Sequence, residues 1–384
     1  MTSRRILLIN HQYPPLGGGS GNATRHIARG LARLGHKPCV LTTAWGDLPL
    51  MEEVDGVALR RIPAMRRNAE TITTSEATAF MAAAMVAAPA LALQMKSEAA
   101  LVFSVLPCAP AGWLLKRSKG MPYVIALQGG DVREIPPPHS RRQKLVRRGL
   151  NYLWRDASAV VAHADGLAER ARRINPHIPV EVIPSGADVD GITPKENYAA
   201  TGDAKLLYVG RLAKNKGLDI LLPALARLSS ALKWKLTLIG DGPEWPMIAA
   251  QAARFALIDR IELHGWQGWN TLPEIYRSAD IFVLPSRDEG MPAALLEAMA
   301  TGLPVIGTRI SGMGEAVLHG ETGLLVPGGD SNALADALTQ MIADPTRWEA
   351  LGRAGRARVE SYYSWTSVAE KWLDVIERVL HAKA

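Results

Sequence analysis

Two glutamates whose carboxylates could face a ligand lie close together in the second half of the chain. Glu289 and Glu297 stand at the two ends of the run EGMPAALLE. The apolar run at 281–284 predicts a strand before them, and Pro292 suits a first helical turn, where its missing N–H costs no hydrogen bond. We therefore expect Glu289 in a loop at a helix N-terminus and Glu297 more than one turn inside the helix, at the strand's carboxyl end, where open α/β sheets bind ligands. Position alone leaves a second interpretation open at equal weight. In it, Glu289 is an acidic residue favoured by the helix dipole at the helix N-terminus, and Glu297 is a solvated helix residue.

A second group of residues suited to an anionic ligand lies in the run YVGRLAKNKG, residues 208–217. Gly210 and Arg211 directly follow a predicted strand, and Lys216 precedes the next helix. A guanidinium offers a planar fork to phosphate oxygens and an ammonium a mobile point charge, so Arg211 and Lys216 together suit a diphosphate. Taken alone, Arg211 or Lys216 would be interpreted as an ordinary surface charge. Glycine turns at 239–243 and 264–266 follow two more predicted strands, but α/β proteins also use glycine there for structural reasons.

The first half of the chain has a glycine-rich run, PPLGGGSGN, at residues 14–22. It follows a predicted strand and leads into a helix expected from about residue 23 to residue 34. Glycines allow the backbone to approach a ligand closely, so a phosphate or a sugar could lie at this helix N-terminus. The run does not fit a dinucleotide fingerprint, because residue 22 is Asn and the second strand ends in Thr42 and Thr43 without an acidic residue.

Short apolar runs followed by helical patterns recur along the chain, as is typical of parallel βα units. The segment 175–202, rich in Pro, Gly, Asp and Asn, is the least periodic and indicates an interdomain connection. Apolar residues at three- and four-residue spacing predict an amphipathic helix at 364–380. We therefore expect two α/β domains, 1–185 and 186–363, and a C-terminal helix at 364–384. The predicted strands are 4–10, 38–43, 101–105, 123–127, 159–162, 205–209, 235–239, 261–264, 281–284 and 305–308.

The composition is that of an ordinary globular protein and excludes collagen-like, coiled-coil and wholly disordered chains. Of 384 residues, 48% are hydrophobic and 21% charged, and two cysteines cannot form a disulfide framework. The net charge of +7 is uneven, because residues 1–190 have 24 Lys and Arg against 15 acidic residues, whereas the remainder has 20 against 22. Apolar stretches at 77–95 and 99–115 approach the length of a membrane span but contain prolines, so we expect buried core elements. The apolar run behind Arg4 and Arg5 is too short for a signal peptide, so no export signal is expected.

Together these runs resemble the retaining glycosyltransferases of family 4. The resemblance covers nearly the whole chain and rests on the glutamate pair in EGMPAALLE, its AMA.G.PVI continuation, and the Gly-Arg…Lys-Gly element at 210–217. It implies the α/β fold called GT-B, in which two Rossmann-like domains face each other across a cleft and the C-terminal helix returns to the N-terminal domain.

The resemblance also implies roles in donor binding. Arg211 and Lys216 would hold the diphosphate of a nucleotide-sugar, Glu297 would bind the ribose hydroxyls, and Glu289 would contact the transferred sugar. Fixed positive charge aimed at a departing nucleoside diphosphate lowers the barrier to transfer. The base would lie near His264, Gly265 and Trp266. The full donor-binding set is Gly18, Gly19, Gly210, Arg211, Lys216, Glu289, Gly290, Met291 and Glu297.

The run LQGGDV resembles the element (H/R)-G-x-D that faces the acceptor in this family. It makes Asp131 a candidate hydroxyl contact or proton acceptor, and the catalytic set becomes Arg211, Lys216, Glu289 and Asp131. Gln128 stands where many relatives have His or Arg, so a histidine-based acceptor role does not carry over. His163 is a second candidate there, although a hydrogen-bonded structural histidine is the favoured interpretation, as it is for His11.

The function expected from the resemblance is transfer of a hexose, with retention, from a UDP- or GDP-sugar to a hydroxyl acceptor in glycan, glycolipid or polysaccharide synthesis. The nucleotide-sugar is a co-substrate, and no other cofactor is expected. No metal is expected, because Arg211, Lys216 and helix amides would do what a cation does and no Asp-x-Asp motif occurs. A phosphorylase, a sugar-nucleotide epimerase and a non-catalytic nucleotide-binding subunit stay open as alternatives. No nucleic-acid recognition motif supports that class of partner.

A basic segment at 141–155 bears on the acceptor and on location. Arg141, Arg142, Lys144, Arg147 and Arg148 lie there beside apolar residues. This pattern fits an interfacial helix on anionic lipid, where each basic residue contributes ~1 kcal/mol, although a solvated helix face is slightly favoured. From the excess of Lys and Arg in residues 1–190, we predict an acceptor that is anionic or linked to a lipid. The predicted location is the cytoplasm, peripheral on the inner face of the membrane if the segment contacts lipid.

Overall fold

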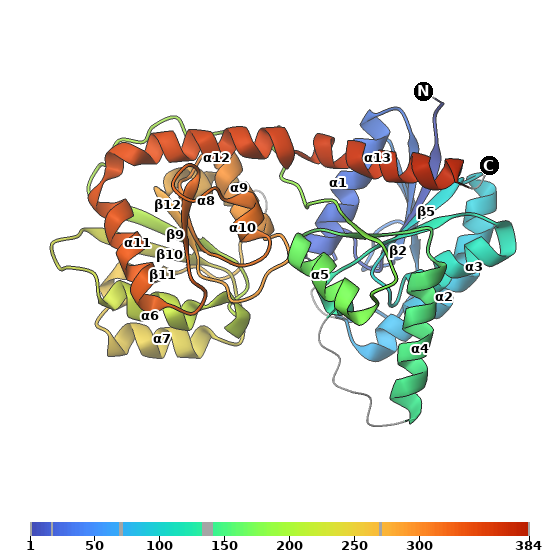
Figure 1. The fold of residues 1–384 in the computed structure, drawn as a ribbon, viewed down its shortest axis with the longest axis horizontal. Helices are drawn as coiled ribbons and strands as arrows, with labels where there is room; N and C mark the ends of the chain where they lie inside the picture. Colours follow the sequence, from blue (N-terminus) through green and yellow to red (C-terminus); the bar gives the residue numbers. More distant parts are fainter. Residues whose placement is uncertain (1, 17, 69–71, 133–140, 269–270, 383–384) are drawn as a thin grey trace. The chain divides into compact units, whose positions relative to one another are not determined.

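The computed structural model describes residues 2–16, 18–68, 72–132, 141–268 and 271–382, with residues 141–147 described by their helical backbone. The chain divides into two compact units. The N-terminal unit comprises residues 1–185 and 365–384, and the C-terminal unit comprises residues 186–364 (Figure 1).

Within the described ranges, the sheet of the N-terminal unit has eight strands in the order β3-β4-β2-β1-β5-β6-β7-β8. Its pairs are parallel except for β3, which runs antiparallel to β4. The strands are β1 (Arg5–Ile9), β2 (Lys37–Thr43), β3 (Met51–Val54), β4 (Val57–Ile62), β5 (Ala99–Phe103), β6 (Tyr123–Ala126), β7 (Ala159–Ala162) and β8 (Val180–Val182).

Helices cover both faces of this sheet, which is why its central strands are apolar throughout. On β1, Leu7 and Ile9 belong to one buried cluster and Ile6 and Leu8 to another, as the alternation of a strand requires. The first cluster includes α2 (Thr74–Gln94), α3 (Ala109–Lys119), α5 (Asp165–Ile174) and Trp154 of α4 (Arg141–Asp156). The second includes α1 (Gly19–Arg33) and α13 (Trp365–His381).

The C-terminal unit has, in its described part, a parallel six-stranded sheet in the order β11-β10-β9-β12-β13-β14. The strands are β9 (Ala204–Val209), β10 (Trp234–Ile239), β11 (Ile261–Leu263), β12 (Ile281–Leu284), β13 (Val305–Thr308) and β14 (Gly323–Val326). The helices are α6 (Leu218–Ala226), α7 (Trp245–Arg254), α8 (Leu272–Ser278), α9 (Ala293–Thr301), α10 (Met313–Ala316), α11 (Ser331–Ala343) and α12 (Trp348–Tyr362).

Each sheet has a point where the strand order reverses. In the C-terminal unit the chain proceeds from β9 to β10 and β11, then crosses back so that β12 lies on the other side of β9. In the N-terminal unit β1 is followed outward by β2, and β5 lies on its other side. Loops that leave the carboxyl ends of two such strands diverge, and open α/β sheets bind ligands in the resulting crevice.

The C-terminal helix α13 packs on α1 of the N-terminal unit, as the sequence predicted. His26 of α1 stacks on Trp365, with ring centroids 4.9 Å apart and planes at 3°. Arg4 donates to both carboxylate oxygens of Glu377 at 2.7 Å, so an ion pair fixes the far end of the helix. Gly30 lies where a Cβ atom would come within 2.4 Å of the Cβ of Ala369.

The predicted strands are confirmed to within two residues at each end. Four strands were not predicted, namely β3, β4, β8 and β14. For β3 and β4 the signal was present, because Asp55 and Gly56 both have positive φ and form the two-residue turn of a hairpin. Two helix starts differ from the prediction, since α1 begins four residues earlier, at Gly19, and α9 begins at Ala293 behind Pro292.

The expectation that residues 77–95 form a buried core element is wrong for most of the helix. Only 33% of the most apolar window of α2 is buried. Apolar composition does not distinguish a core helix from one that covers the sheet with a single side, and α2 is of the second kind.

Replacing Gly30 tests the packing of α13 on α1. We expect Gly30→Ala to lower the free energy of unfolding by ~1–3 kcal/mol, because the added methyl group overpacks the contact with Ala369. Urea unfolding measures this, with Gly19→Ala in the same helix as control, since a Cβ atom there meets nothing within 4 Å. Equal stability of the two variants would contradict the close helix contact.

Candidate functional site

The crevice of the C-terminal unit brings a cation and a carboxylate together. Lys216, in the loop after β9, forms an ion pair through its Nζ with Oε1 of Glu289, in the loop after β12. The Ser286 hydroxyl donates to the same oxygen at 2.8 Å. The two charged side chains are 18% and 11% exposed, so they are largely buried but remain accessible. Residues 73 positions apart thus meet at the point where the strand order reverses.

A close backbone approach makes this contact possible. Gly217 has a φ of +72°, and a Cβ atom there would lie 2.0 Å from the carbonyl oxygen of Pro285. Glycine is therefore required both by its conformation and by the space available. The loop that carries Lys216 lies directly against the end of β12.

Arg211, at the start of the same loop, is exposed and makes no ion pair with any residue that the structure describes. Its backbone carbonyl accepts a hydrogen bond from the Tyr208 hydroxyl at 3.0 Å, which fixes the loop at this point. Gly210, the remaining predicted residue here, donates its N–H to the Ile239 carbonyl at 3.0 Å. The guanidinium of Arg211 is therefore available to an anionic ligand at the carboxyl edge of the sheet.

A second ion pair joins the loop after β12 to the first turn of α6 and was not predicted. Arg287 donates to the two carboxylate oxygens of Asp219 at 2.5 and 2.8 Å, and these hydrogen bonds hold the pKa of Asp219 below its usual value. The N–H of Arg287 also donates to the carbonyl of Asn215 at 2.7 Å, and its guanidinium donates to that of Lys214 at 3.1 Å. Arg287 thus fixes the turn that carries Lys216 against the loop that carries Glu289.

Glu297 lies inside α9 and is 8% exposed, so the interpretation of a solvated helix residue is wrong. The hydroxyl of Tyr276 in α8 donates to its Oε2 at 2.9 Å. Burial raises the pKa of Glu297 to about 7, against the lowering effect of the Tyr276 hydrogen bond. Tyr276 engages one carboxylate oxygen and orients the group, a role that the sequence did not reveal because the partner is 21 residues away.

Gly290 and Met291 lie between the two glutamates and are held by the loop after β13. A Cβ atom at Gly312, whose φ is +79°, would lie 1.6 Å from the carbonyl oxygen of Gly290. Met291 is buried. Three loops at the carboxyl edge therefore pack directly on one another and place the glutamate run.

The residues predicted to face a base follow β11, two strands from β9 on the same edge of the sheet. Trp266 is 69% exposed. Gly265 accepts a hydrogen bond from the N–H of Gly240 at 2.7 Å, and His264 contacts Glu262 at 3.3 Å. The exposed indole ring is available for stacking.

In the N-terminal unit, Gly18 and Gly19 lie at the N-terminus of α1, where Gly18 is the N-cap. A Cβ atom at either residue would meet nothing within 4 Å, so the backbone faces open space. Asn10, at the end of β1, donates to the Thr24 hydroxyl at 2.7 Å and so joins the strand to this helix. The glycine-rich turn therefore presents a helix N-terminus at the second crevice.

Asp131 lies beside that crevice, in the short helix η1 (Gly129–Val132) after β6. Its Oδ1 accepts a hydrogen bond from the N–H of Val105 at 3.0 Å, and its Oδ2 accepts one from Gln128 at 2.8 Å. Burial raises its pKa to about 7, and the backbone hydrogen bonds oppose that shift. The carboxylate joins the loops after β5 and β6.

Of the two candidate histidines of this unit, His11 is buried and His163 is half-buried. The Nδ1 atom of His163 lies 3.1 Å from the Leu127 carbonyl, and its burial lowers its pKa. Burial lowers the pKa of His11 to about 4, and its Nδ1 lies 4.0 Å from Sγ of Cys108. Both imidazoles are therefore neutral near pH 7, as expected of structural histidines.

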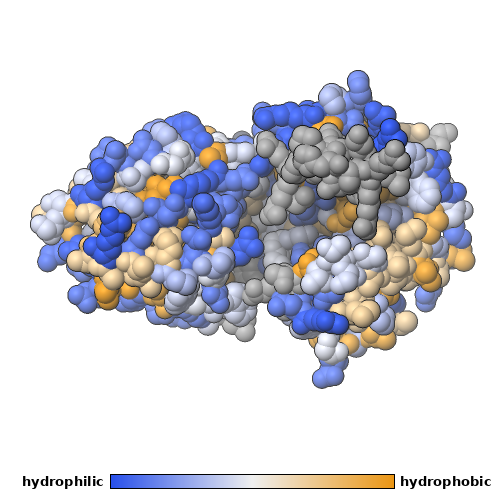
Figure 2. All heavy atoms as spheres, turned by 90° about the horizontal axis from the view of Figure 1, so that it is seen from below, coloured by the Kyte–Doolittle hydropathy of each residue, from blue (hydrophilic) through white to orange (hydrophobic). Residues whose placement is uncertain are grey.

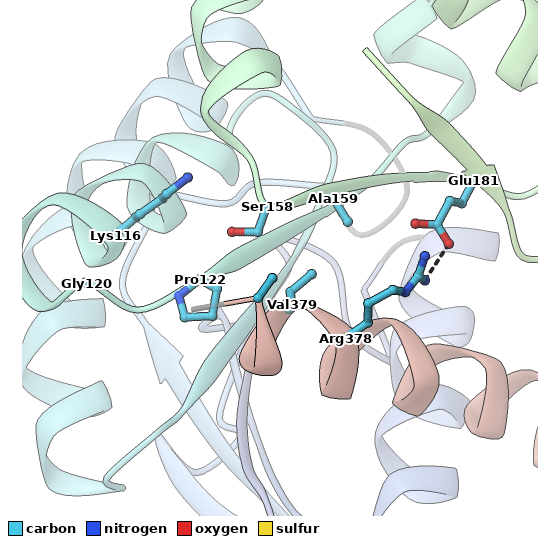
Figure 3. A pocket seen from close by; sticks show the side chains of 9 residues that line it. Lys116, Gly120, Pro122, Ser158, Ala159, Glu181, Arg378 and Val379 are labelled. Carbon is cyan, nitrogen blue, oxygen red and sulfur yellow. Dashed lines mark hydrogen bonds and ion pairs between the residues drawn. The ribbon is translucent and has the colours of Figure 1, made fainter. Parts of the chain in front are cut away.

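A separate hollow of about 400 Å³ lies at the opposite, amino-terminal edge of the N-terminal sheet (Figure 3). It is lined by residues that precede β6 and β7, such as Pro122 and Ser158, and by Arg378, which pairs with Glu181 at 2.7 Å. None of the predicted site residues lines it. Elsewhere too, the described residues include no group of three or more His, Cys, Asp or Glu placed to hold a metal ion.

Comparison with known proteins identifies the class of molecule to which this site belongs. Residues 203–344 match the family described as Glycosyl transferases group 1, and residues 18–186 match the family described as Glycosyl transferase 4-like domain. The chain is 25% identical over 391 residues to an uncharacterized glycosyltransferase of Methanocaldococcus jannaschii, with 97% of each covered. It is 27% identical to a GDP-mannose-dependent alpha-(1-6)-phosphatidylinositol monomannoside mannosyltransferase of Mycolicibacterium smegmatis, over 94% of this chain and 95% of that protein.

Solved structures show the same fold. Sucrose-phosphate synthase from Thermosynechococcus elongatus aligns with a TM-score of 0.84 at 24% identity, covering 99% of this chain and 100% of that one. Anabaena HepE in complex with UDP and glucose aligns with a TM-score of 0.74 at 18% identity, covering 98% and 100%. The fold is GT-B, and the chain belongs to the family 4 glycosyltransferases, enzymes that transfer sugars.

The Arg287–Asp219 pair generates a prediction about activity. We expect Arg287→Ala to lower kcat/KM at least ~10-fold, because the turn that carries Lys216 loses the guanidinium bonds to Asp219 and Lys214, although the backbone bond to Asn215 remains, and small displacements of reacting groups are costly. Steady-state kinetics measures this. The exchanged pair, Arg287→Asp with Asp219→Arg, should recover part of the loss.

The matched control is Arg353→Ala. It breaks an ion pair with Glu349 on the surface of α12, where the two side chains are 66% and 54% exposed. That variant should keep full activity, and a similar loss in both variants would contradict a positioning role for Arg287.

The buried carboxyl of Glu297 predicts a dependence of stability on pH. Between pH 4.5, its ordinary pKa, and about pH 7, the folded chain retains a proton that the unfolded chain has released, so stability falls as pH rises through this window. Glu297→Gln removes the effect while keeping an acceptor for Tyr276. Its stability relative to the wild type should therefore be ~2 kcal/mol more favourable at pH 8 than at pH 5.5.

Denaturant unfolding at the two pH values measures the difference. Glu274→Gln, at an exposed position of α8, removes a carboxyl group outside the core and is the control. A constant difference between Glu297→Gln and wild type would mean that the carboxyl titrates normally.

Proposed function

We propose that this glycosyltransferase transfers a hexose from a UDP- or GDP-sugar to a hydroxyl acceptor, with retention of the anomeric configuration and without a metal ion. The observation that carries the proposal is the contact of Lys216 with Glu289 beside the exposed Arg211. A nucleotide-sugar presents phosphates and sugar hydroxyls side by side, and this crevice offers cations and a carboxylate side by side. The mannosyltransferase relative uses GDP-mannose, and the HepE structure contains UDP and glucose, which supports these two donor classes.

The cations and the carboxylates of the site bind different parts of the donor. The guanidinium of Arg211 and the ammonium of Lys216 bind the diphosphate and stabilise the negative charge that develops as it departs. Glu289, which already accepts hydrogen bonds from Ser286 and Lys216, accepts further ones from hydroxyls of the sugar. Glu297, oriented by Tyr276, accepts hydrogen bonds from the ribose, and Trp266 stacks on the base.

Transfer then proceeds on one face of the sugar. The bond between C1 and the phosphate oxygen breaks through an oxocarbenium-like state, and the acceptor oxygen forms its bond to C1 on the same side. The proton of the acceptor hydroxyl passes to the departing phosphate oxygen. In the N-terminal unit, Gly18 and Gly19 offer helix N-terminal amides to an anionic ligand group, and Asp131 holds the loops after β5 and β6 and takes part in binding the acceptor hydroxyl.

Nucleotide binding tests this assignment. We expect UDP or GDP, at ~100 times its dissociation constant, to raise the free energy of unfolding by about 2.7 kcal/mol. ADP at the same concentration should raise it less. Arg211→Ala should weaken that binding ~10–100-fold, the effect of losing a charge-assisted hydrogen bond to phosphate. Thermal-shift titration measures both.

The control is Lys214→Ala, which removes an exposed cation from the same turn. If Lys214→Ala and Arg211→Ala weaken nucleotide binding equally, only general positive charge is at work and the site assignment fails. The anomeric configuration of the product, read by NMR, separates retention from inversion. Release of a sugar phosphate or of an isomerised donor would indicate the phosphorylase or the epimerase instead.

A further inference from the structure

An apolar stripe runs along the outer side of α2. Ala82, Val86, Ala90 and Leu93 recur at three- and four-residue spacing and are all exposed. Val86 is 80% exposed and Leu93 67%. The stripe is about 16 Å long, at 1.5 Å per residue, and contains no charged side chain. Single exposed apolar residues are ordinary, whereas a continuous stripe of this kind marks an interaction surface.

The opposite side of α2 belongs to the core of the N-terminal unit. Its buried residues include Phe80, Ala84, Ala88 and Leu91, which pack with α3 and the sheet. By length and composition the helix could cross a membrane, but removing it from the fold would expose this core. A helix held along one side can lie on a bilayer with its other side inserted at the interface.

An apolar hollow of about 320 Å³ lies close by, between α3 and α4. Its walls are Leu106, Trp113, Gly149, Leu150, Tyr152 and Leu153, and Leu106 and Tyr152 are 44% and 46% exposed. Because α2 packs on α3 and α3 packs on α4, the stripe and the hollow lie on neighbouring helices of one sheet face. Viewed from below, the N-terminal unit presents a broad area of apolar residues, coloured orange and tan (Figure 2).

The same three helices carry the positive charge of the protein. Their sequences contain nine Lys and Arg against two acidic residues, a net charge of +7 that equals that of the whole chain. Both acidic groups are engaged, Glu76 in the capping box of α2 and Asp156 with Arg117 at 2.5 Å. Exposed cations with described side chains include Lys119, Arg148 and Arg155.

This combination of positive charge and exposed apolar side chains indicates which kind of partner binds the surface. Exposed apolar side chains on α2 and exposed Lys and Arg on the neighbouring α3 and α4, with the acidic groups engaged, are complementary to an anionic lipid surface. A second copy of the chain would bring the same three cationic helices face to face, which like-charge repulsion opposes. The surface of α2, α3 and α4 is here named the cationic apolar face. It is therefore more complementary to an anionic membrane than to the same face of a second copy of the chain.

We propose that the cationic apolar face docks the protein peripherally on an anionic bilayer, with the α2 stripe at the interface and the α3–α4 hollow admitting an acyl chain. The anionic leaflet that such a surface meets in cells is the cytoplasmic one. Leu106 of the hollow lies in the loop after β5, which Asp131 holds at the acceptor crevice. If the proposed acceptor side is correct, docking also presents lipid-linked acceptors to that crevice.

Vesicle sedimentation of the full chain, without any donor, tests the proposal. The wild type should bind phosphatidylcholine vesicles that contain phosphatidylglycerol, bind pure phosphatidylcholine vesicles much more weakly, and lose binding as salt is raised. Val86→Glu with Leu93→Glu should reduce binding at least ~10-fold, because two apolar side chains leave the interface. Ile258→Glu, at a 63% exposed position of the C-terminal unit, should leave binding unchanged.

Both replaced residues are exposed, so the double variant should keep the thermal midpoint and the nucleotide-induced shift of the wild type. Those two measurements separate failure of this proposal from failure of the donor site. Absence of binding to anionic vesicles by the wild type would overturn the proposal, as would full binding by the double variant. A loss of self-association in the double variant, seen by light scattering with vesicle binding intact, would identify the face as a contact between copies instead.

Discussion

The contact between Lys216 and Glu289 depends on a single backbone constraint. At Gly217 the loop after β9 passes so close to the end of β12 that a Cβ atom would lie 2.0 Å from a carbonyl oxygen. This approach brings two loops together at the place where the strand order reverses, and the Arg287–Asp219 pair then holds them there. Without the close approach, the sheet would still form, but the ammonium and the carboxylate would lie apart on two loops that do not touch.

Each unit also contains a buried carboxyl group whose pKa burial raises to about 7. Asp131 is oriented by two backbone amides and Glu297 by the hydroxyl of Tyr276. Burying an ionisable group opposes folding, and the hydrogen bonds of Asp131 and Glu297 offset part of that effect. Such groups are common where a site must bind hydroxyls or handle protons, because a fixed carboxylate needs no reorientation when the ligand arrives.

Much of the fold could be predicted because its signals are local. Apolar runs followed by helical patterns marked the strands on either side of each crevice, and the positions of Arg211, Lys216 and Glu289 followed from the strands before them. The partnerships that arrange the site could not be predicted, because Arg287 and Asp219 lie 68 residues apart and nothing local distinguishes them from surface charges. The burial of Glu297 also escaped prediction, since it depends on how α8 packs beside α9.

The exposure of α2 illustrates a different limit. An alanine-rich apolar helix has the same sequence pattern whether the fold encloses it or it covers the fold from outside. Which of the two occurs depends on the elements that pack around it. The start of α1 at Gly19 is a similar case, because the hydrogen bonds of Asn10 with Ser20 and Thr24 extend the helix into a run whose composition predicts a loop.

The return of α13 to the N-terminal unit has a consequence for how the chain is made. Ile6 and Leu8 of the first strand share a buried cluster with Val368, Trp372 and Ile376 of the last helix. During synthesis the first domain therefore leaves the ribosome with this sheet face covered by α1 but not by α13, and the whole second domain emerges before that last helix. In folding order the second domain is an insertion within the first, and the N-terminal unit is the last to be completed.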